Sequence, residues 1–152
     1  KLDEIKPYID IWGSSGAQSA QLMKDGEVEM STIWNGRMDA AIADGAMGDY
    51  TFNGGIASLD CLAIPMGSQN PDVAMKVLAA LVSADLQANI PFHINYGPTN
   101  SGAFALGKIT EEMTARSPSA PGNLKNQVIV RAEWWAENGE AVQERWDAWH
   151  IE

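Results

Sequence analysis

"SLDCLAIPMGSQNPDVAMKVLAALVSADLQA", residues 58–88, is the stretch that indicates how the chain folds. Leu62 to Ile64 is a short apolar run closed by Pro65, which is typical of a buried strand. Asn70 is predicted to cap the following helix, and Pro71 stands in the first turn, where proline is tolerated. Apolar residues then recur at helical spacing: Val73, Val77, Leu78, Leu81 and Val82. A strand followed directly by a helix favours an α/β fold.

The residues before this stretch show the same alternation of helix and strand. Ser15, with Gln18 three residues later, forms a capping-box pattern that predicts the start of a helix. Gly26 is well placed to end it. Residues 28–34 alternate between polar and apolar side chains and predict a half-buried strand, after which a second helix is expected over residues 37–44. The fold class predicted from this order is α/β.

The residues after it form a turn-rich connector and a group of helices. "INYGPTN", residues 94–100, contains strong turn signals. Ser83 is expected to begin a short helix before it. The tail, residues 131–152, predicts a terminal amphipathic helix whose stripe comprises Ala141, Val142, Arg145, Trp146 and Trp149. We interpret its tryptophans as packing of the terminal helices on the rest of the fold; they are Trp134, Trp135, Trp146 and Trp149.

Composition excludes several classes of function. The chain has 152 residues and a net charge of −10, which argues against a nucleic-acid partner. An acidic surface is compatible with a cationic partner, but a solvated acidic face is the better explanation of the charge. Cys61 is the single cysteine, expected to be a small buried hydrophobe, and His93 and His150 lack ligand spacing. No metal or other cofactor is therefore expected. The chain begins at Lys1 rather than methionine, which suggests a mature or excised segment.

Signatures of catalysis are absent from the sequence. It has no GxSxG elbow, no phosphate-binding Walker loop and no GxGxxG after a strand. The paired acids Asp3/Glu4 and Glu111/Glu112 fit the first turns of helices, where they favour the helix dipole. The chain is not expected to be an enzyme. An enzyme half whose catalytic groups lie in a missing N-terminal segment stays as the weaker alternative.

Four motifs together carry a resemblance to a known family. They are "DGEVEMSTIWNGR" (residues 25–37), the stretch 58–88 quoted above, "INYGPTN" and "AEWWAENGEAVQERWDAW" (residues 132–149). In this order they resemble the extracellular solute-binding proteins of bacterial ABC importers, in the spermidine/putrescine-binding branch. Members of that family are about twice as long, and this chain is similar to their C-terminal half.

The resemblance implies an incomplete fold of the periplasmic binding protein type II class. In that family two α/β lobes close over a ligand and the chain crosses between them. Residues 1–58 would belong to the second lobe, residues 59–97 would form a hinge strand and a helical segment of the first lobe, and residues 98–152 would return to the second lobe. A missing N-terminal lobe would complete the structure, and without it the chain is expected to self-associate through exposed apolar surface.

The resemblance also implies a ligand-binding site. Trp34 would stack on the methylene chain of a polyamine, Asp60 would pair with an ammonium group, and Tyr96 would line the cleft. Aromatic faces attract cations, and carboxylates form charge-assisted hydrogen bonds with ammonium groups. Ser58 stands where the spermidine binder has a second aromatic residue, which thins the cage. Arg37 either pairs with a neighbouring acid, Asp39 or Asp44, or recognises a carboxylate or phosphate group.

Each of these residues has a structural alternative. Trp34 could be a core residue under the second helix, Asp60 a turn or capping residue, and Tyr96 a packed turn tyrosine. The acid at Asp60 lies between apolar residues of a predicted strand, where a buried charge would need a partner, and this favours a binding role.

The function implied is that of the solute-binding component of an ABC importer. It would bind a small amine such as putrescine or spermidine and deliver it to the membrane permease. The alternative is the same scaffold binding an amino-acid-like or opine-like carboxylate, with Arg37 on the acid. The implied location is the periplasm, or the extracellular face through a lipid anchor in a Gram-positive source.

Overall fold

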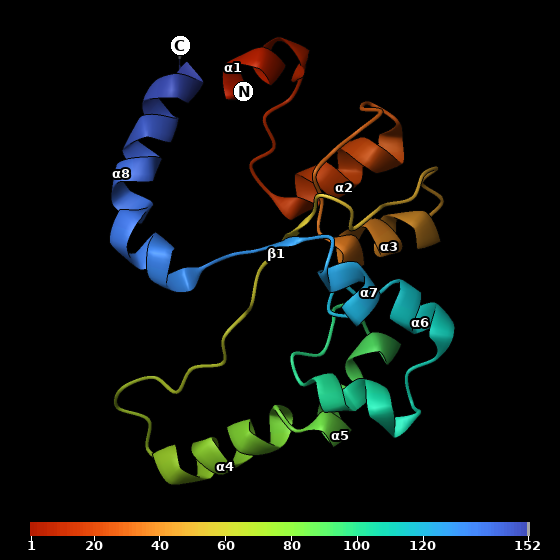
Figure 1. The fold of residues 1–152 in the computed structure, drawn as a ribbon, viewed down its shortest axis with the longest axis vertical. Coiled ribbons are helices and arrows are strands. Elements are labelled where there is room, and N and C mark those ends of the chain that lie inside the picture. Colours follow the sequence, from red (N-terminus) through yellow and green to blue (C-terminus); the bar gives the residue numbers. More distant parts are fainter. Residues whose placement is uncertain (152) are drawn as a thin grey trace.

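The computed structural model describes residues 1–151 and shows a helical chain with little sheet (Figure 1). The α-helices are α1 (Leu2–Ile5), α2 (Gly16–Asp25), α3 (Asn35–Ala43), α4 (Pro71–Leu81), α5 (Ala84–Gln87), α6 (Glu111–Ala115), α7 (Pro121–Leu124) and α8 (Ala132–Ile151). The 3₁₀ helices are η1 (Lys6–Tyr8), η2 (Ile90–Phe92) and η3 (Ser101–Leu106), and the strands are β1 (Ile56–Ala57) and β2 (Val128–Ile129).

Helices α2 and α3 pack against each other and form what we call the first helical unit, together with the loop of residues 44–52. The cap predicted for α2 is confirmed, because Ser15 Oγ accepts a hydrogen bond from the backbone N–H of Gln18 at 3.2 Å. Gly26 ends the helix with φ 68°, a left-handed conformation that glycine adopts without strain. Helix α3 buries Met38 and Ala41.

Helices α5 and η3 pack together and, with α6, form the second helical unit. Its small apolar core contains Ala88, Ala103 and Ile109, with Phe104 and Met113 packed against it. The predicted short helix after Ser83 is confirmed: it is α5, and Ser83 Oγ accepts a hydrogen bond from the N–H of Leu86 at 3.4 Å.

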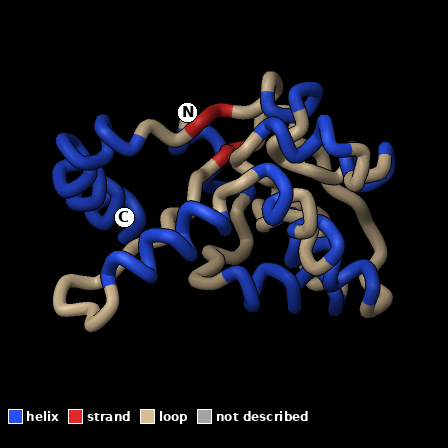
Figure 2. Tube along the Cα trace, turned by 90° about the horizontal axis from the view of Figure 1, so that it is seen from below, coloured by secondary structure: helices blue, strands red, loops and turns tan. Residues whose placement is uncertain are grey.

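The two predicted strands are absent from the structure. Residues 28–34 have no regular structure, and Leu62 and Cys61 are exposed on an irregular segment. The predictions of a buried strand at Leu62–Ile64 and of a buried Cys61 are therefore wrong. A strand needs a neighbouring backbone to satisfy its N–H and C=O groups, and within residues 1–151 neither segment has one. The sheet in this part of the chain is the parallel pair β1–β2, with Ile56 opposite Val128 (Figure 2).

Residues 58–70 lead away from the first helical unit to α4, and the chain returns at residues 94–100 (Figure 1). Helix α4 begins at Pro71 as predicted, but the side chain of Asn70 makes no capping hydrogen bond. Asn70 has φ −132° and ψ 60°, outside the extended region typical of a capping residue. The boundaries 1–58, 59–97 and 98–152 remain a prediction.

Helix α8 lies apart from α4, in the upper left of Figure 1 with α4 below it, and contacts the N-terminal segment. The ring centroid of Trp12 lies 5.6 Å from that of Trp146 and 5.6 Å from that of Trp149. Lys6 Nζ donates to the carbonyl oxygen of Trp149 at 2.6 Å. The predicted packing of the terminal tryptophans on the fold therefore needs correction: Trp134 and Trp135 are exposed and contact each other edge to face.

In the described part of the chain no single helix is long and apolar enough to cross a membrane. Helix α4 taken together with Ala84–Phe92 reaches the required length and apolarity, but the two are bent by 60° at their junction.

Candidate functional site

Trp34 stands at the N-terminal end of α3 and is 57% exposed. Its ring is therefore not part of a core formed by residues 1–151. Its backbone is extended, with φ −67° and ψ 129°, and its carbonyl oxygen accepts the first hydrogen bonds of the helix. The indole lies against the first residue of α2: a Cβ built on Gly16 would lie 2.5 Å from Trp34 Cε3. Glycine at this position therefore makes room for the ring.

Arg37 follows one turn later, and of its two predicted roles the ion pair with Asp39 or Asp44 does not form. Asp39 pairs with Arg116, and Asp44 pairs with Lys24 at 3.1 Å. The guanidinium carbon of Arg37 instead lies 5.6 Å from the centroid of the Trp34 ring, a cation–π arrangement. Arg37 is exposed, so the first turn of α3 presents an aromatic face and a cation together.

Tyr96 approaches the same turn from the returning segment of the chain. A Cβ built on Gly36 would lie 2.7 Å from Tyr96 Cε1, so only glycine allows the ring to come this close. Tyr96 is half-buried. The structure thus brings three of the predicted site residues, Trp34, Arg37 and Tyr96, to the first turn of α3.

Asp60 and Ser58 are placed differently. Both are exposed on the segment that follows β1, and no hydrogen bond, ion pair or ring contact joins Asp60 to another described residue. Asp60 is solvated on this exposed segment and therefore does not need the partner that a buried acid would require. The structure does not bring Asp60 or Ser58 into contact with Trp34 or Tyr96.

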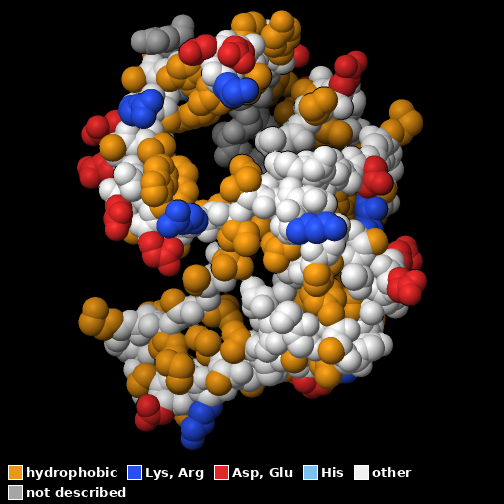
Figure 3. All heavy atoms as spheres, in the orientation of Figure 1, with side chains coloured by type: hydrophobic (Ala, Val, Ile, Leu, Met, Phe, Trp, Pro, Cys, Tyr) orange, Lys and Arg blue, Asp and Glu red, His pale blue; other side chains and the backbone are white. Residues whose placement is uncertain are grey.

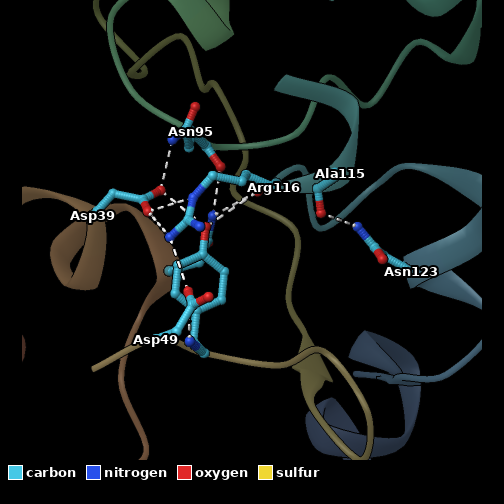
Figure 4. A network of polar contacts seen from close by, with 8 residues as sticks. Asp39, Asp49, Asn95, Ala115, Arg116 and Asn123 are labelled. Carbon is cyan, nitrogen blue, oxygen red and sulfur yellow. Dashed lines mark hydrogen bonds and ion pairs between the residues drawn. The ribbon is translucent and has the colours of Figure 1, made fainter. Parts of the chain in front are cut away.

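A polar network that the sequence did not indicate is centred on Asp39 of α3 (Figure 4). Asp39 Oδ1 accepts hydrogen bonds from Nε of Arg116 at 2.8 Å and from its Nη2. Asp39 Oδ2 accepts from Asn95 Nδ2 at 2.6 Å and from the hydroxyl of Tyr50 at 2.9 Å. Arg116 also reaches Asp49 Oδ1 at 3.2 Å, and its guanidinium lies 4.5 Å from the Tyr50 ring centroid. We call these five residues the Asp39 network.

The Asp39 network changes the acidity of its members. Burial, then the hydrogen bond to Asp39 and the charge of that carboxylate, raise the pKa of Tyr50 to about 12. The backbone N–H of Tyr50 and the charge of Arg116 lower the pKa of Asp49. Burial lowers the pKa of Arg116, but its hydrogen bond to Asp39 and the neighbouring negative charges outweigh this effect and raise it overall.

The returning segment is also packed tightly beyond Tyr96. A Cβ built on Gly97 would lie 2.6 Å from Ser119 Cβ, so the two backbones approach closely. The hydroxyl groups of Ser117 and Ser119 are buried and find no hydrogen-bond partner among the described residues. Among residues 1–151, no group of three or more His, Cys, Asp or Glu side chains is arranged to hold a metal ion.

Comparison with known proteins places this arrangement in a family. Residues 1–117 match the bacterial extracellular solute-binding protein family. The gamma-aminobutyric acid-binding protein of Pseudomonas aeruginosa is 34% identical over 149 residues, which is 98% of this chain and 42% of that protein. The spermidine/putrescine-binding periplasmic protein of Salmonella typhimurium is 26% identical over 143 residues, 93% of this chain and 39% of that protein.

Solved structures agree with the sequence matches. An ABC transporter substrate-binding protein from Bradyrhizobium japonicum USDA 110 superposes with a TM-score of 0.88 at 43% identity, covering 97% of this chain and 46% of that one. The periplasmic binding protein MotA from A. tumefaciens B6, solved with glucopine, gives a TM-score of 0.80 at 40% identity, again covering 97% and 46%.

These comparisons confirm the resemblance and the fold class. The chain spans less than half the length of each of these relatives, and its fold is a part of the periplasmic binding protein type II fold. The relatives are binding proteins rather than enzymes. This chain belongs to the bacterial extracellular solute-binding protein family.

Proposed function

We propose that this chain is part of the solute-binding component of an ABC importer, and that it helps to bind a small amine that also carries a carboxylate. The observation that carries the proposal is the first turn of α3, where exposed Trp34 and Arg37 stand together while the nearby acids are paired elsewhere. A guanidinium with no acidic partner among residues 1–151 suits a carboxylate ligand, and the indole suits the alkyl chain and the ammonium group.

The relatives support this ligand class over a simple polyamine. The relative at 34% identity binds gamma-aminobutyric acid, and MotA, at 40% identity, was solved with glucopine. Gamma-aminobutyric acid carries one ammonium group and one carboxylate. A polyamine has only cationic groups, which the charge of Arg37 would repel.

A polyamine is the second candidate ligand. It is supported by the relative that binds spermidine and putrescine, and by the net charge of −10. On this reading Trp34 and Tyr96 hold the methylene chain, Asp60 reaches an ammonium group after lobe closure, and Arg37 faces away from the ligand. Ser58 would lie at the edge of the site.

The wider setting is part of the same proposal. The N-terminal polypeptide that the relatives possess would supply the other lobe, and a membrane permease would receive the solute. The family's description favours the periplasm or the outer face of the membrane as the location.

A thermal-shift screen of the full-length protein tests the proposal. A ligand that binds only the native state raises the melting temperature as its concentration exceeds the dissociation constant. We expect gamma-aminobutyric acid or an opine to raise it more than putrescine or spermidine at the same concentration. A larger shift with the polyamines would favour the second candidate, and no shift with any of them would contradict both.

A further inference from the structure

Trp34 and Tyr96 come from different parts of the molecule. Trp34 begins α3 in the first helical unit, whereas Tyr96 lies on the segment that returns from α4 and α5 toward the second helical unit. Their relative position therefore depends on what joins the two units, and the Asp39 network lies at that junction (Figure 4).

The carboxylate of Asp39 has both oxygens occupied by donors from other segments. One oxygen holds the guanidinium of Arg116, which follows α6. The other accepts from Asn95 on the returning segment and from Tyr50 on the loop after α3. The side chain of Asp39, in the middle of α3, is only 16% exposed, against 68% for Asp44 at the C-terminal end of the same helix. Four charge-assisted hydrogen bonds at one partly buried carboxylate make a rigid junction.

Asn95 is held from two sides. Its side chain donates to Asp39 at 2.6 Å, and its carbonyl oxygen accepts a hydrogen bond from Asn35 Nδ2 at 2.5 Å. Asn35 is the residue after Trp34, and Asn95 is the residue before Tyr96. The two asparagines therefore connect the two aromatic residues through short bonds, and the Tyr96 ring reaches the glycine between Asn35 and Arg37.

We propose that Asp39 is a positioning residue for solute binding: it holds Asn95, and through Asn95 it fixes Tyr96 against the turn that carries Trp34. This inference rests on the proposed function, in that the two aromatic residues contact the solute. Asp39 itself would touch no ligand, since both of its carboxylate oxygens already accept hydrogen bonds from Tyr50, Asn95 and Arg116.

The first test is a double-mutant cycle between Asp39 and Tyr96 in the full-length protein, with binding of gamma-aminobutyric acid measured by calorimetry. A small displacement of a contacting group can cost about 100-fold in function, so we expect Asp39→Asn to weaken binding by at least about tenfold. In a Tyr96→Ala background the same change should have little further effect, because the group that it positions is gone. Equal losses in both backgrounds would overturn the proposal.

Asp44→Asn is the matched control. Asp44 caps the same helix and also pairs with a cation, Lys24, but both side chains are exposed. Binding should be unchanged in this variant. Should Asp39→Asn fail to fold, Asn95→Ala replaces it. This substitution removes the hydrogen bond from the Asn95 side chain to Asp39 and leaves the ion pair of Asp39 with Arg116 intact.

A second measurement needs no ligand and so separates this inference from the proposed function. With 3-fluorotyrosine at position 96, the fluorine resonance reports the surroundings of that ring. We expect Asp39→Asn or Asn95→Ala to shift or broaden the resonance, and Asp44→Asn to leave it in place. An unchanged resonance in both network variants would overturn the positioning role, even if the protein binds solute. Absence of binding by the wild type, together with a shifted resonance, would contradict the proposed function and leave the junction supported.

Discussion

At the scale of single residues, Trp34 shows how burial decides between two interpretations. The residue is 57% exposed, and its ring lies on Gly16 and beside Arg37. A core tryptophan would have lost most of its exposure on folding. The indole is therefore free to contact a ligand, in keeping with the role expected from the family resemblance.

Trp34→Ala should consequently change stability little. We expect a loss of about 1 kcal/mol or less in the free energy of unfolding, measured by urea denaturation. Met38→Ala is the comparison, because Met38 is 1% exposed and its truncation should cost about 2–5 kcal/mol. A loss of about 3–5 kcal/mol for Trp34→Ala would show that the ring belongs to the core after all.

The environment of Tyr50 predicts how the stability of the fold depends on pH. Its pKa is raised to about 12, mainly by burial and then by Asp39, whereas an unfolded tyrosine titrates near about 10. The folded protein thus holds the phenolic proton more tightly, and this contribution to stability is complete below about pH 10. It is lost as the pH rises toward about 12.

Urea denaturation at a series of pH values between about 9 and about 12 checks this expectation. Wild type should lose more stability over the interval than Tyr50→Phe, which has no proton to release. Tyr8→Phe is the control, since Tyr8 is 84% exposed, and it should follow the wild type. Parallel curves for wild type and Tyr50→Phe would contradict the raised pKa.

At the scale of elements, helices were predictable from the sequence and strands were not. The signals for α2 are local: Ser15 caps the helix and Gly26 ends it, and both lie within a few residues of what they stabilise. A strand depends on a partner elsewhere in the chain. Residues 28–34 and 62–64 have strand-like patterns, but no partner lies in the described part of the chain.

The same distinction applies to the site. Trp34 and Tyr96 could be selected because each belongs to a recognisable motif, and the structure brings both to α3. The pairing of Asp39 with Arg116 joins residues 77 apart in the sequence, and no local pattern indicates it. The resemblance implies a binding role for Asp60, but the supporting pattern, an acid inside a buried apolar strand, does not form here, so that role stays a prediction.

Helix α4 carries the clearest unpartnered surface. Leu62 to Ile64 and one face of α4 line an apolar groove of about 470 Å³, which includes Val73, Val77 and Leu81 (Figure 3). Val77 is 54% exposed and Leu81 is 46% exposed. Apolar side chains left exposed together on one face commonly mark an interaction site.

We therefore expect the 152-residue chain by itself to self-associate through α4. Sedimentation at about tens of micromolar should detect dimers or larger species, and Val77→Glu should shift the chain toward the monomer. Met75→Glu is a matched control, because Met75 is 58% exposed on the same helix but does not line the groove. A wild-type monomer at this concentration, or equal effects of the two substitutions, would contradict the role of this face.

At the scale of the whole molecule, almost the entire length of this chain aligns with each relative. The aligned part is less than half of the relative's own length. Its apolar groove at α4 and its sparse sheet are what a part of a two-lobed protein would show. The TM-score of 0.88 with a substrate-binding protein supports this view, since it is obtained over 97% of the chain.

The central claim is that Arg37 and Trp34 bind an amine that also bears a carboxylate. Calorimetric titration of the full-length protein with gamma-aminobutyric acid and with putrescine, for wild type and Arg37→Ala, tests it most directly. We expect the wild type to bind gamma-aminobutyric acid more tightly than putrescine, and Arg37→Ala to lose this preference because the carboxylate loses its cation. Tighter binding of putrescine by the wild type, or a preference that Arg37→Ala leaves unchanged, would contradict the account.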